Sequence, residues 1–427
     1  MIEAFDVIVV GAGPAGMAAA VAASNSRGRV CMLDENPSAG GQIWRGFNTE
    51  NSSTYPEANV LARLHQRLRK SNINARYGVR IVDKIAPRVL RVEADGGSSD
   101  LAFEHLILAT GARERFLPFP GWTLPGVIGV GGLQAIVKSG LSIAGKRVVI
   151  SGSGPLLLAV AASLSRYGAH IQGIYEQTPF ARVAHFALDL IAHPAKIREG
   201  VGYRIAARSA PFHTSSWIVR AHGAGRLRSV TVSVKGALRE IQCDYLACGF
   251  HLIPNLELPR LLGCAIEGGY VRVDANQRSS IQNVYCAGEL TGIGGLDKAL
   301  CEGEIAGLAC IDKSAAAHYA RRAGLKHFAD RIERGFAIRQ ELTQLAAPDT
   351  FVCRCEDIPR RALEACDSWR EAKLYTRCGM GPCQGRVCGP ATEALFGWKH
   401  ETVRPPLSPA RLETLAASQG LLQNRRE

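Results

Sequence analysis

The feature that most constrains this chain is a glycine-rich turn close to its N-terminus. Residues 5–10 have the apolar pattern of a buried strand, and they continue directly into Gly11-Ala12-Gly13-Pro14-Ala15-Gly16 and an alanine-rich helix. Gly11 permits the tight turn, Gly13 lets the backbone approach a pyrophosphate, and Gly16 lets the helix pack closely on the strand. This order of strand, turn and helix predicts a βαβ unit that binds a dinucleotide at the helix N-terminus.

The next predicted strand, residues 29–33, ends at two acids, Asp34 and Glu35. They lie 18 and 19 residues beyond Gly16, where such a unit places the carboxylate that accepts the ribose hydroxyls of the dinucleotide. The spacing does not decide which of the two acids has this role.

A second unit of the same kind begins at residue 147. Its strand is followed by Gly152-Ser153-Gly154-Pro155-Leu156-Leu157, and its second strand ends at Glu176. Leu157 replaces the third glycine, and we expect it to push helix and strand apart. Glu176 would repel a 2′-phosphate and so favours NAD over NADP. The ligand stays open between NAD, another adenine nucleotide and none, and we expect no catalytic use of NAD here.

Length and composition fit a multidomain enzyme. The chain has 427 residues, of which 47% are hydrophobic, enough for two or three domains. No apolar run is long enough for a membrane helix. Thirteen cysteines without an export signal predict a reducing, cytoplasmic location. The net charge of +13 comes from scattered residues, so it predicts a basic surface or a partner protein that is acidic, and not nucleic-acid binding.

The C-terminal part has a different composition. Cys353-Arg354-Cys355 and the later pair Cys383 and Cys388 are separated by 27 residues, and six cysteines lie within residues 353–388, a span of 36 residues. Four thiolates satisfy a tetrahedral zinc ion or a 2Fe-2S cluster, and a spacer of one residue favours the cluster. Cys366 lies on a predicted helix, residues 360–366, and is expected to pack in a core. The seven cysteines before residue 350 are expected to behave as small core hydrophobes.

Two segments favour FAD as the ligand of the first unit. Residues 106–112, which contain Thr110-Gly111, and residues 284–289, which end in Gly288-Glu289, resemble the two strand-and-turn signatures of the glutathione reductase and thioredoxin reductase superfamily. The resemblance implies that Glu289 holds the ribityl chain, a role usually taken by the shorter Asp. Gly41-Gln42 is similar to that family's turn beside the flavin, with an ordinary surface turn as the alternative. No Cys-x-x-Cys pair precedes residue 350, which argues against a disulfide reductase.

Residues 351–397 resemble the bacterioferritin-associated ferredoxin-like 2Fe-2S domain. The run from residue 376 to residue 388 is similar to the version fused to flavin-containing amine and imino acid dehydrogenase subunits, in which four residues separate the second cysteine pair. This resemblance implies the metal ligands Cys353, Cys355, Cys383 and Cys388. Cys378 remains a rival for one position, because its spacing to Cys383 is the same.

Residues 5–397 as a whole resemble the α or A subunits of heteromeric opine, proline and D-hydroxyproline dehydrogenases and of hydrogen cyanide synthase. The segments that carry the resemblance are residues 41–43, 119–127, 248–250 and 288–295. It implies an electron-transfer subunit with FAD and a 2Fe-2S cluster, beside a sarcosine-oxidase-like flavoprotein subunit that oxidises the C–N bond of an imino or amino acid. The alternatives are an NADH-dependent reductase and a scaffold with structural cofactors. The catalytic residues, the substrate, the terminal acceptor, an FMN at a subunit interface and a third, small subunit stay open.

The expected fold is therefore α/β, with two Rossmann-like dinucleotide-binding domains, one inserted in the other, and a small α-helical 2Fe-2S domain. The predicted parts are an FAD domain (1–115 and 246–320), a second dinucleotide domain (116–245), a linker (321–349), the 2Fe-2S domain (350–400) and a tail (401–427).

Overall fold

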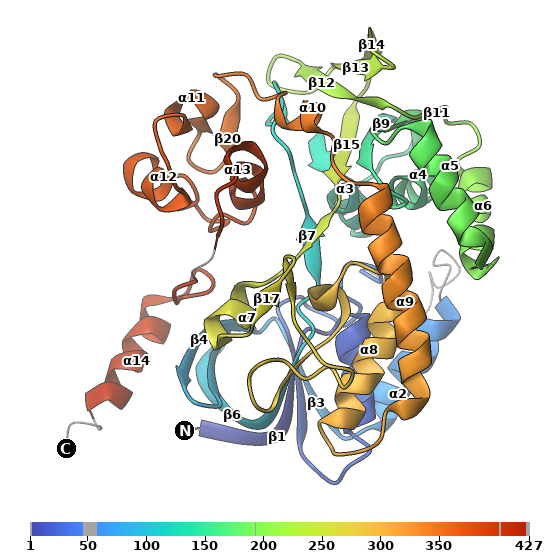
Figure 1. Cartoon of the computed structure of the whole chain (residues 1–427). Coiled ribbons are helices and arrows are strands. Elements are labelled where there is room, and N and C mark those ends of the chain that lie inside the picture. The colour runs from blue at the N-terminus through green and yellow to red at the C-terminus, as the bar shows by residue number, and fades with distance from the viewer. Residues whose placement is uncertain (1, 46–57, 193, 401–402, 424–427) are drawn as a thin grey trace. The chain divides into compact units, whose positions relative to one another are not determined.

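The computed structural model describes residues 2–45, 58–192, 194–400 and 403–423. The chain divides into two compact units (Figure 1). The first consists of residues 1–113, 253–330 and 401–427, and the second consists of residues 114–252 and 331–400. The second unit is thus inserted in the first, and we describe each by itself.

The core of the first unit is a seven-stranded sheet in the order β3-β2-β1-β6-β5-β4, with β19 also paired to β6. Strands β1, β2, β3, β6 and β19 are parallel neighbours, whereas β4, β5 and β6 form an antiparallel meander. The bounds are β1 Ile2–Val10, β2 Val30–Asp34, β3 Ile73–Tyr77, β4 Arg80–Ala86, β5 Val89–Ala94, β6 Gly97–Leu108 and β19 Val284–Cys286. The central strands β1 and β2 are largely buried apolar runs, as strands covered on both faces require, whereas the edge strand β3 is polar and partly exposed.

The helices of the first unit pack through small residues. Helix α1 (Pro14–Ala23) lies against α8 (Leu296–Ala309). A Cβ at Gly303 would lie 2.1 Å from the Ala15 carbonyl oxygen, and one at Gly307 would lie 2.3 Å from that of Ala19. Glycine at both positions is therefore required for this close helix pair. The remaining helices are α2 (Ala58–Lys70), α7 (Glu257–Leu262), α9 (Ala316–Gly335), which continues into the second unit, and α14 (Leu412–Gln423).

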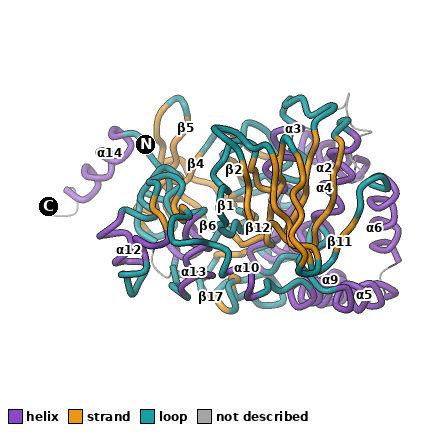
Figure 2. The backbone as a smooth tube through the Cα atoms, turned by 90° about the horizontal axis from the view of Figure 1, so that it is seen from above, coloured by secondary structure: helices purple, strands orange, loops and turns teal. Residues whose placement is uncertain are grey.

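The second unit contains a five-stranded parallel sheet in the order β11-β10-β9-β15-β8. Figure 2 labels its edge strand β11. Its strands are β8 Val127–Gly129, β9 Arg147–Ser153, β10 His170–Glu176, β11 Phe212–His213 and β15 Tyr245–Phe250. Its helices are α3 Val130–Lys138, α4 Leu156–Arg166, α5 Phe180–Asp189 and α6 Pro194–Ala206. A separate antiparallel sheet consists of β12 Ser216–His222, β13 Ser229–Val234 and β14 Ala237–Gln242.

A small helical module ends the second unit. It contains the hairpin of β20 (Phe351–Cys353) and β21 (Ile358–Pro359) and the helices α11 (Arg360–Leu363), α12 (Trp369–Thr376) and α13 (Cys388–Phe396). The indole Nε1 of Trp122 donates to the Phe351 carbonyl oxygen at 2.6 Å. This bond attaches the module to the rest of the second unit.

The α/β class with two Rossmann-like units is confirmed. The helix predicted for residues 360–366 is too long, because α11 ends at Leu363 and Cys366 packs in the core of the module beyond it. The predicted linker is mostly ordered as the end of α9 and α10 (Gln340–Thr343). In the part of the chain that the structure describes, no helix is long and apolar enough to cross a membrane.

Candidate cofactor sites

The first glycine turn has the geometry of a dinucleotide site. Gly11 has a φ of +104°, and a Cβ there would lie 2.2 Å from the Ala109 carbonyl oxygen. A Cβ at Gly16 would lie 1.7 Å from the Gly11 carbonyl oxygen. Helix α1 begins at Pro14 without a side-chain cap. The N–H groups of its first turn are therefore available to a phosphate.

The structure distinguishes between the two candidate acids. Asp34 is buried, and its Oδ2 accepts a hydrogen bond from the Ala12 N–H at 2.5 Å. Its Oδ1 accepts from the backbone N–H and the side-chain amide of Asn36, both at 2.7 Å. Glu35 is exposed. Asp34 is thus the acid that lies at the glycine turn.

Two further turns lie against this site. A Cβ at Gly41 would lie 3.0 Å from the Gly13 Cα, so the two backbones face each other closely. The neighbouring Gln42 is exposed. Gly288 has a φ of +78°, and a Cβ there would lie 2.9 Å from that of Ala15. The space around the first turn of α1 is thus shaped by glycines, as a cradle for a flat, phosphate-bearing ligand requires.

The turn at Thr110-Gly111 is fixed by Asn255. The Thr110 hydroxyl donates to the Asn255 carbonyl oxygen at 3.0 Å, and the Asn255 side-chain amide donates to the Thr110 carbonyl oxygen at 2.8 Å. The Asn255 N–H also donates to the Gly111 carbonyl oxygen. Sequence reasoning missed Asn255, because it follows no motif.

Glu289 lies in the short 3-10 helix Gly288–Thr291, which precedes α8. Its carboxylate accepts hydrogen bonds from the N–H groups of Gly294 at 3.1 Å and of Gly295 at 2.9 Å. Burial raises the pKa of Glu289, while Lys298 and these hydrogen bonds lower it. The carboxylate thus fixes the loop that leads into α8, and its predicted contact with a ribityl chain remains a prediction.

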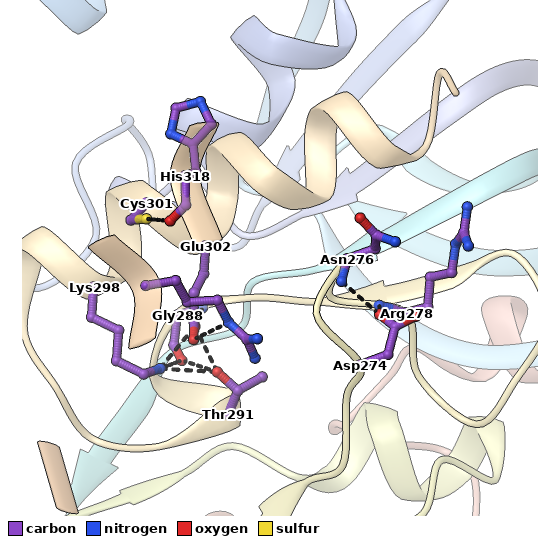
Figure 3. Close-up of polar contacts among 10 residues, drawn as sticks. Asp274, Asn276, Arg278, Gly288, Thr291, Lys298, Cys301, Glu302 and His318 are labelled. Atoms are coloured by element: carbon purple, nitrogen blue, oxygen red, sulfur yellow. Dashed lines mark hydrogen bonds and ion pairs between the residues drawn. The ribbon is translucent and has the colours of Figure 1, made fainter. Parts of the chain in front are cut away.

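A buried polar cluster supports the Gly288 turn, and sequence reasoning missed it (Figure 3). The Nζ of Lys298 donates to the Gly288 carbonyl oxygen at 2.9 Å, to the Thr291 hydroxyl at 2.9 Å and to Glu302 Oε2 at 2.8 Å. Glu302 in turn accepts from the Gly288 N–H at 3.0 Å and from the Thr291 hydroxyl at 2.6 Å. Only 1% of each charged side chain is exposed. The sole sequence signal is a Lys–Glu pair four residues apart in a helix that also carries Asp297 and Glu304.

In the second unit, Glu176 lies at the glycine turn. Its Oε2 accepts from the Gly154 N–H at 2.7 Å, and its Oε1 accepts from the Thr178 N–H at 2.8 Å. Burial raises the pKa of Glu176, and the hydrogen bonds from Thr178 and Gly154 oppose this rise. Gly152 has a φ of +151°, and a Cβ there would lie 1.7 Å from the Gly249 carbonyl oxygen. Glycine is thus required at the turn whether or not a nucleotide binds.

Five of the six C-terminal cysteines gather in the helical module. The sulfurs of Cys353, Cys378 and Cys388 all lie within 4.8 Å of one another. Cys355 and Cys383 contact each other, and Cys355 interacts electrostatically with Cys353. The predicted ligands Cys353 and Cys388 are thus brought together with Cys378, the rival, while Cys355 and Cys383 form an adjacent pair. The ligand set remains a prediction.

The thiols of this group are strongly coupled. Hydrogen bonds from Cys378 and Cys388 lower the pKa of Cys353 to about 2. The same contact with Cys353 raises the pKa of Cys388. Soft sulfur donors that lie this close together fit a thiophilic metal or an iron-sulfur cluster.

Comparisons with known proteins agree with the fold of two Rossmann-like units. Residues 5–324 match the family model described as pyridine nucleotide-disulphide oxidoreductase. The chain is 35% identical over 422 residues to the HcnB subunit of hydrogen cyanide synthase from Pseudomonas aeruginosa, covering 89% of this chain and 90% of that protein. It is 30% identical over 460 residues to the A subunit of opine oxidase from Agrobacterium tumefaciens, covering 96% of this chain and 91% of that protein.

Among solved structures, L-proline dehydrogenase from P. horikoshii matches with a TM-score of 0.69 and 18% identity over 97% of this chain and 80% of that one. This likeness shows a common fold. The family model and the relatives cover most of the chain and include the first glycine turn. The chain therefore belongs to the pyridine nucleotide-disulphide oxidoreductase family and is a flavoprotein oxidoreductase related to HcnB and to the A subunit of opine oxidase.

Proposed function

We propose that this chain is the electron-transfer subunit of a heteromeric FAD-dependent dehydrogenase that oxidises the C–N bond of an imino or amino acid. The observation that carries the proposal is the presence, in one chain, of an open glycine turn with its acid and of five gathered cysteines. Relatives named as subunits of hydrogen cyanide synthase and opine oxidase support a role within a larger enzyme.

The first unit would hold FAD through groups that the turn leaves open. The N–H groups at the start of α1 would bind the pyrophosphate, and Asp34 would accept the ribose hydroxyls. Gly41 and Gly288 would leave room for the ring system. Bound FAD would supply the conversion between two-electron and one-electron chemistry. Lys298 and Glu302 would keep the Gly288 turn rigid against it.

The helical module would hold a 2Fe-2S cluster, which supplies one-electron transfer. Cys353, Cys355, Cys383 and Cys388 are the proposed ligands, with Cys378 as a neighbouring thiol that can replace one of them. Serine variants of Cys378 and Cys383 distinguish the two sets. We expect Cys383→Ser to lose iron and acid-labile sulfide, and Cys378→Ser to keep both; the opposite result would assign Cys378 as the ligand.

Oxidation of the substrate is assigned to a partner flavoprotein subunit. The identified polar side chains of the first unit, Asp34, Glu289 and Lys298, all bond to its own backbone. They are suited to hold a cofactor and to set its electrostatic environment, and not to remove a proton from a substrate.

The test is to purify the chain with its native partners and to mix the anaerobic complex with a panel of imino and amino acids. We expect one class of substrate, such as D-hydroxyproline, an opine or proline, to bleach the flavin absorbance and to produce the electron paramagnetic resonance signal of a reduced 2Fe-2S cluster. Rapid bleaching by NADH with the isolated chain would instead favour an NADH-dependent reductase. A complex that no donor reduces would favour a scaffold with structural cofactors.

A further inference from the structure

The two glycine turns of this chain differ in which backbone N–H group is bound by the acid of the unit. Each acid ends the second strand of its unit, and each binds an N–H two residues further on, that of Asn36 or of Thr178. Among the described residues, Asp34 also binds the Ala12 N–H and not that of Gly13. Glu176 is longer by one methylene and binds the N–H of Gly154, which occupies the place of Gly13 in the second turn. The donor that would approach a pyrophosphate is already used.

The helix after the second turn also begins later. Helix α1 starts at the residue that follows Gly13, whereas α4 starts at Leu156, two residues beyond Gly154. Leu157, in place of the third glycine, is buried in the apolar core of the unit. Its N–H donates to the Gly154 carbonyl oxygen at 3.2 Å. The first N–H groups of α4 are thus partly satisfied within the turn.

A segment of the same chain lies on this turn. We call residues 335–339, which connect α9 to α10 (Figure 1), the strap. The Phe336 carbonyl oxygen accepts from the Ser153 hydroxyl at 2.8 Å and from His251 Nε2 at 3.0 Å. A Cβ at Gly154 would lie 3.9 Å from the Phe336 ring. The ring therefore covers the glycine that a dinucleotide would have to approach.

Gln177 also binds the strap, and its Nε2 donates to the Ser153 hydroxyl as well. It is fully buried, its Nε2 donates to the Ala337 carbonyl oxygen at 3.1 Å, and its Oε1 accepts from the Arg339 N–H at 3.2 Å. The buried Phe336 ring also packs edge-on against Phe186 of α5, with centroids 5.0 Å apart. Buried polar groups that are paired in this way are costly to separate.

We propose that the second dinucleotide unit binds its own strap in place of NAD, so that this unit takes no pyridine dinucleotide and instead anchors the segment that leads to the cysteine module. The strap continues through α10, whose Leu342 is buried against β12 and β13, to Phe351, which accepts the Trp122 hydrogen bond. Cys353 follows two residues later. The former nucleotide site thereby fixes the approach to the cysteines. This inference does not depend on which substrate or partner protein the chain serves.

The test uses the full chain loaded with FAD. Isothermal titration with NADH up to millimolar concentration is combined with hydrogen exchange of peptides that cover residues 335–340. We compare the wild type with Gln177→Ala and Ser153→Ala, which remove bonds to the strap. Thr343→Ala is the matched control, because that exposed hydroxyl bonds only to the nearby Gln340 carbonyl oxygen.

The wild type is expected to show no saturable NADH binding. Both strap variants are expected to exchange roughly tenfold faster in residues 335–340, since each loses a buried hydrogen bond, while Thr343→Ala matches the wild type. Ser153→Ala alone suffices if Gln177→Ala does not fold. Binding of one NADH per wild-type chain would overturn the proposal, and so would equal exchange in the strap variants and the control. Neither result bears on substrate-driven reduction of the complex, which tests the proposed function separately.

Discussion

Replacement of Lys298 by methionine provides a quantitative test of the buried cluster in Figure 3. Methionine has nearly the length of lysine, so the change removes one charge and three hydrogen bonds with little loss of volume. Glu302 then keeps the Gly288 N–H and the Thr291 hydroxyl as donors but loses its nearest cation. The remaining positive charge, Arg322 Nε, lies 3.5 Å from the other carboxylate oxygen.

Removal of one member of a buried ion pair costs about 3–5 kcal/mol, because the remaining charge is left in a poorly solvated site. Arg322 compensates in part, so we expect the lower end, about 3 kcal/mol. The double variant Lys298→Met with Glu302→Gln should recover most of this loss, since no isolated charge remains. Arg272→Met is the matched control. Its pair with Glu267 is 58% and 62% exposed, and exposed pairs contribute at most about 1 kcal/mol.

The assay is urea unfolding of the FAD-loaded chain, followed by tryptophan and flavin fluorescence. Lys298→Met should lower the free energy of unfolding more than Arg272→Met does, and flavin release should shift to the same lower urea concentration, because the Gly288 turn belongs to the proposed FAD site. The reasoning is refuted if Lys298→Met costs no more than the exposed control, or if the double variant is less stable than the single one.

Three further outcomes are expected. Gly16→Ala should abolish FAD retention, because the added Cβ would lie 1.7 Å from the Gly11 carbonyl oxygen. Gly96→Ala is the control, because a Cβ there meets open space, and it should bind FAD as the wild type does. Retention of FAD by both variants would contradict the close packing at Gly16. A hydrogen bond from Thr414 and contacts with Arg411 lower the pKa of Glu93. Attachment of the C-terminal segment should therefore be strongest above the ordinary Glu pKa of 4.5 and should weaken as the pH falls through the lower pKa of the folded state. The weakening is measured as faster hydrogen exchange of residues 411–417. Glu93→Gln should remove this pH dependence. Trp122→Phe should cost about 1 kcal/mol and loosen the cysteine module against proteolysis, while equal digestion of variant and wild type would argue that this bond does not anchor it.

The first glycine turn was largely predictable from sequence, because each of its requirements is local. Gly11 and Gly16 are required by backbone contacts within or beside the motif itself. The choice between Asp34 and Glu35 was not predictable, because it depends on which side chain points toward the turn at the end of β2. One residue of shift exchanges the two faces of a strand, and only the folded strand fixes that choice.

In the cysteine module, too, the sequence did not decide which residues have the predicted role, because the decisive contacts join residues that are further apart in the chain. The number of cysteines and their spacing predict a soft-metal site. They do not decide between Cys378 and Cys383 for one ligand position, because a loop with several glycines connects these two residues. A Cβ at Gly379 would lie 2.4 Å from the Trp369 ring, and one at Gly381 would lie 2.3 Å from that of Cys355. The loop is thus folded tightly around Trp369 in a way that brings Cys378 beside Cys353. Neither contact follows from the spacing.

The strap was not predictable, because its residues form no motif and its partners are more than 80 positions away in the sequence. The sequence of residues 321–349 does not show that Phe336, among the apolar residues of this polar segment, packs on the second glycine turn. The second glycine turn itself held the better signal. A leucine in place of the third glycine predicts poor packing on a pyrophosphate, and a glutamate where the first unit has Asp34 can reach one N–H further. The leucine thus disfavours close packing on a pyrophosphate, the glutamate takes up the Gly154 N–H, and the Phe336 carbonyl group binds at this turn instead. A glycine-rich turn therefore indicates a βαβ unit, while the residues that complete its hydrogen bonds decide whether the ligand is a cofactor or the chain itself.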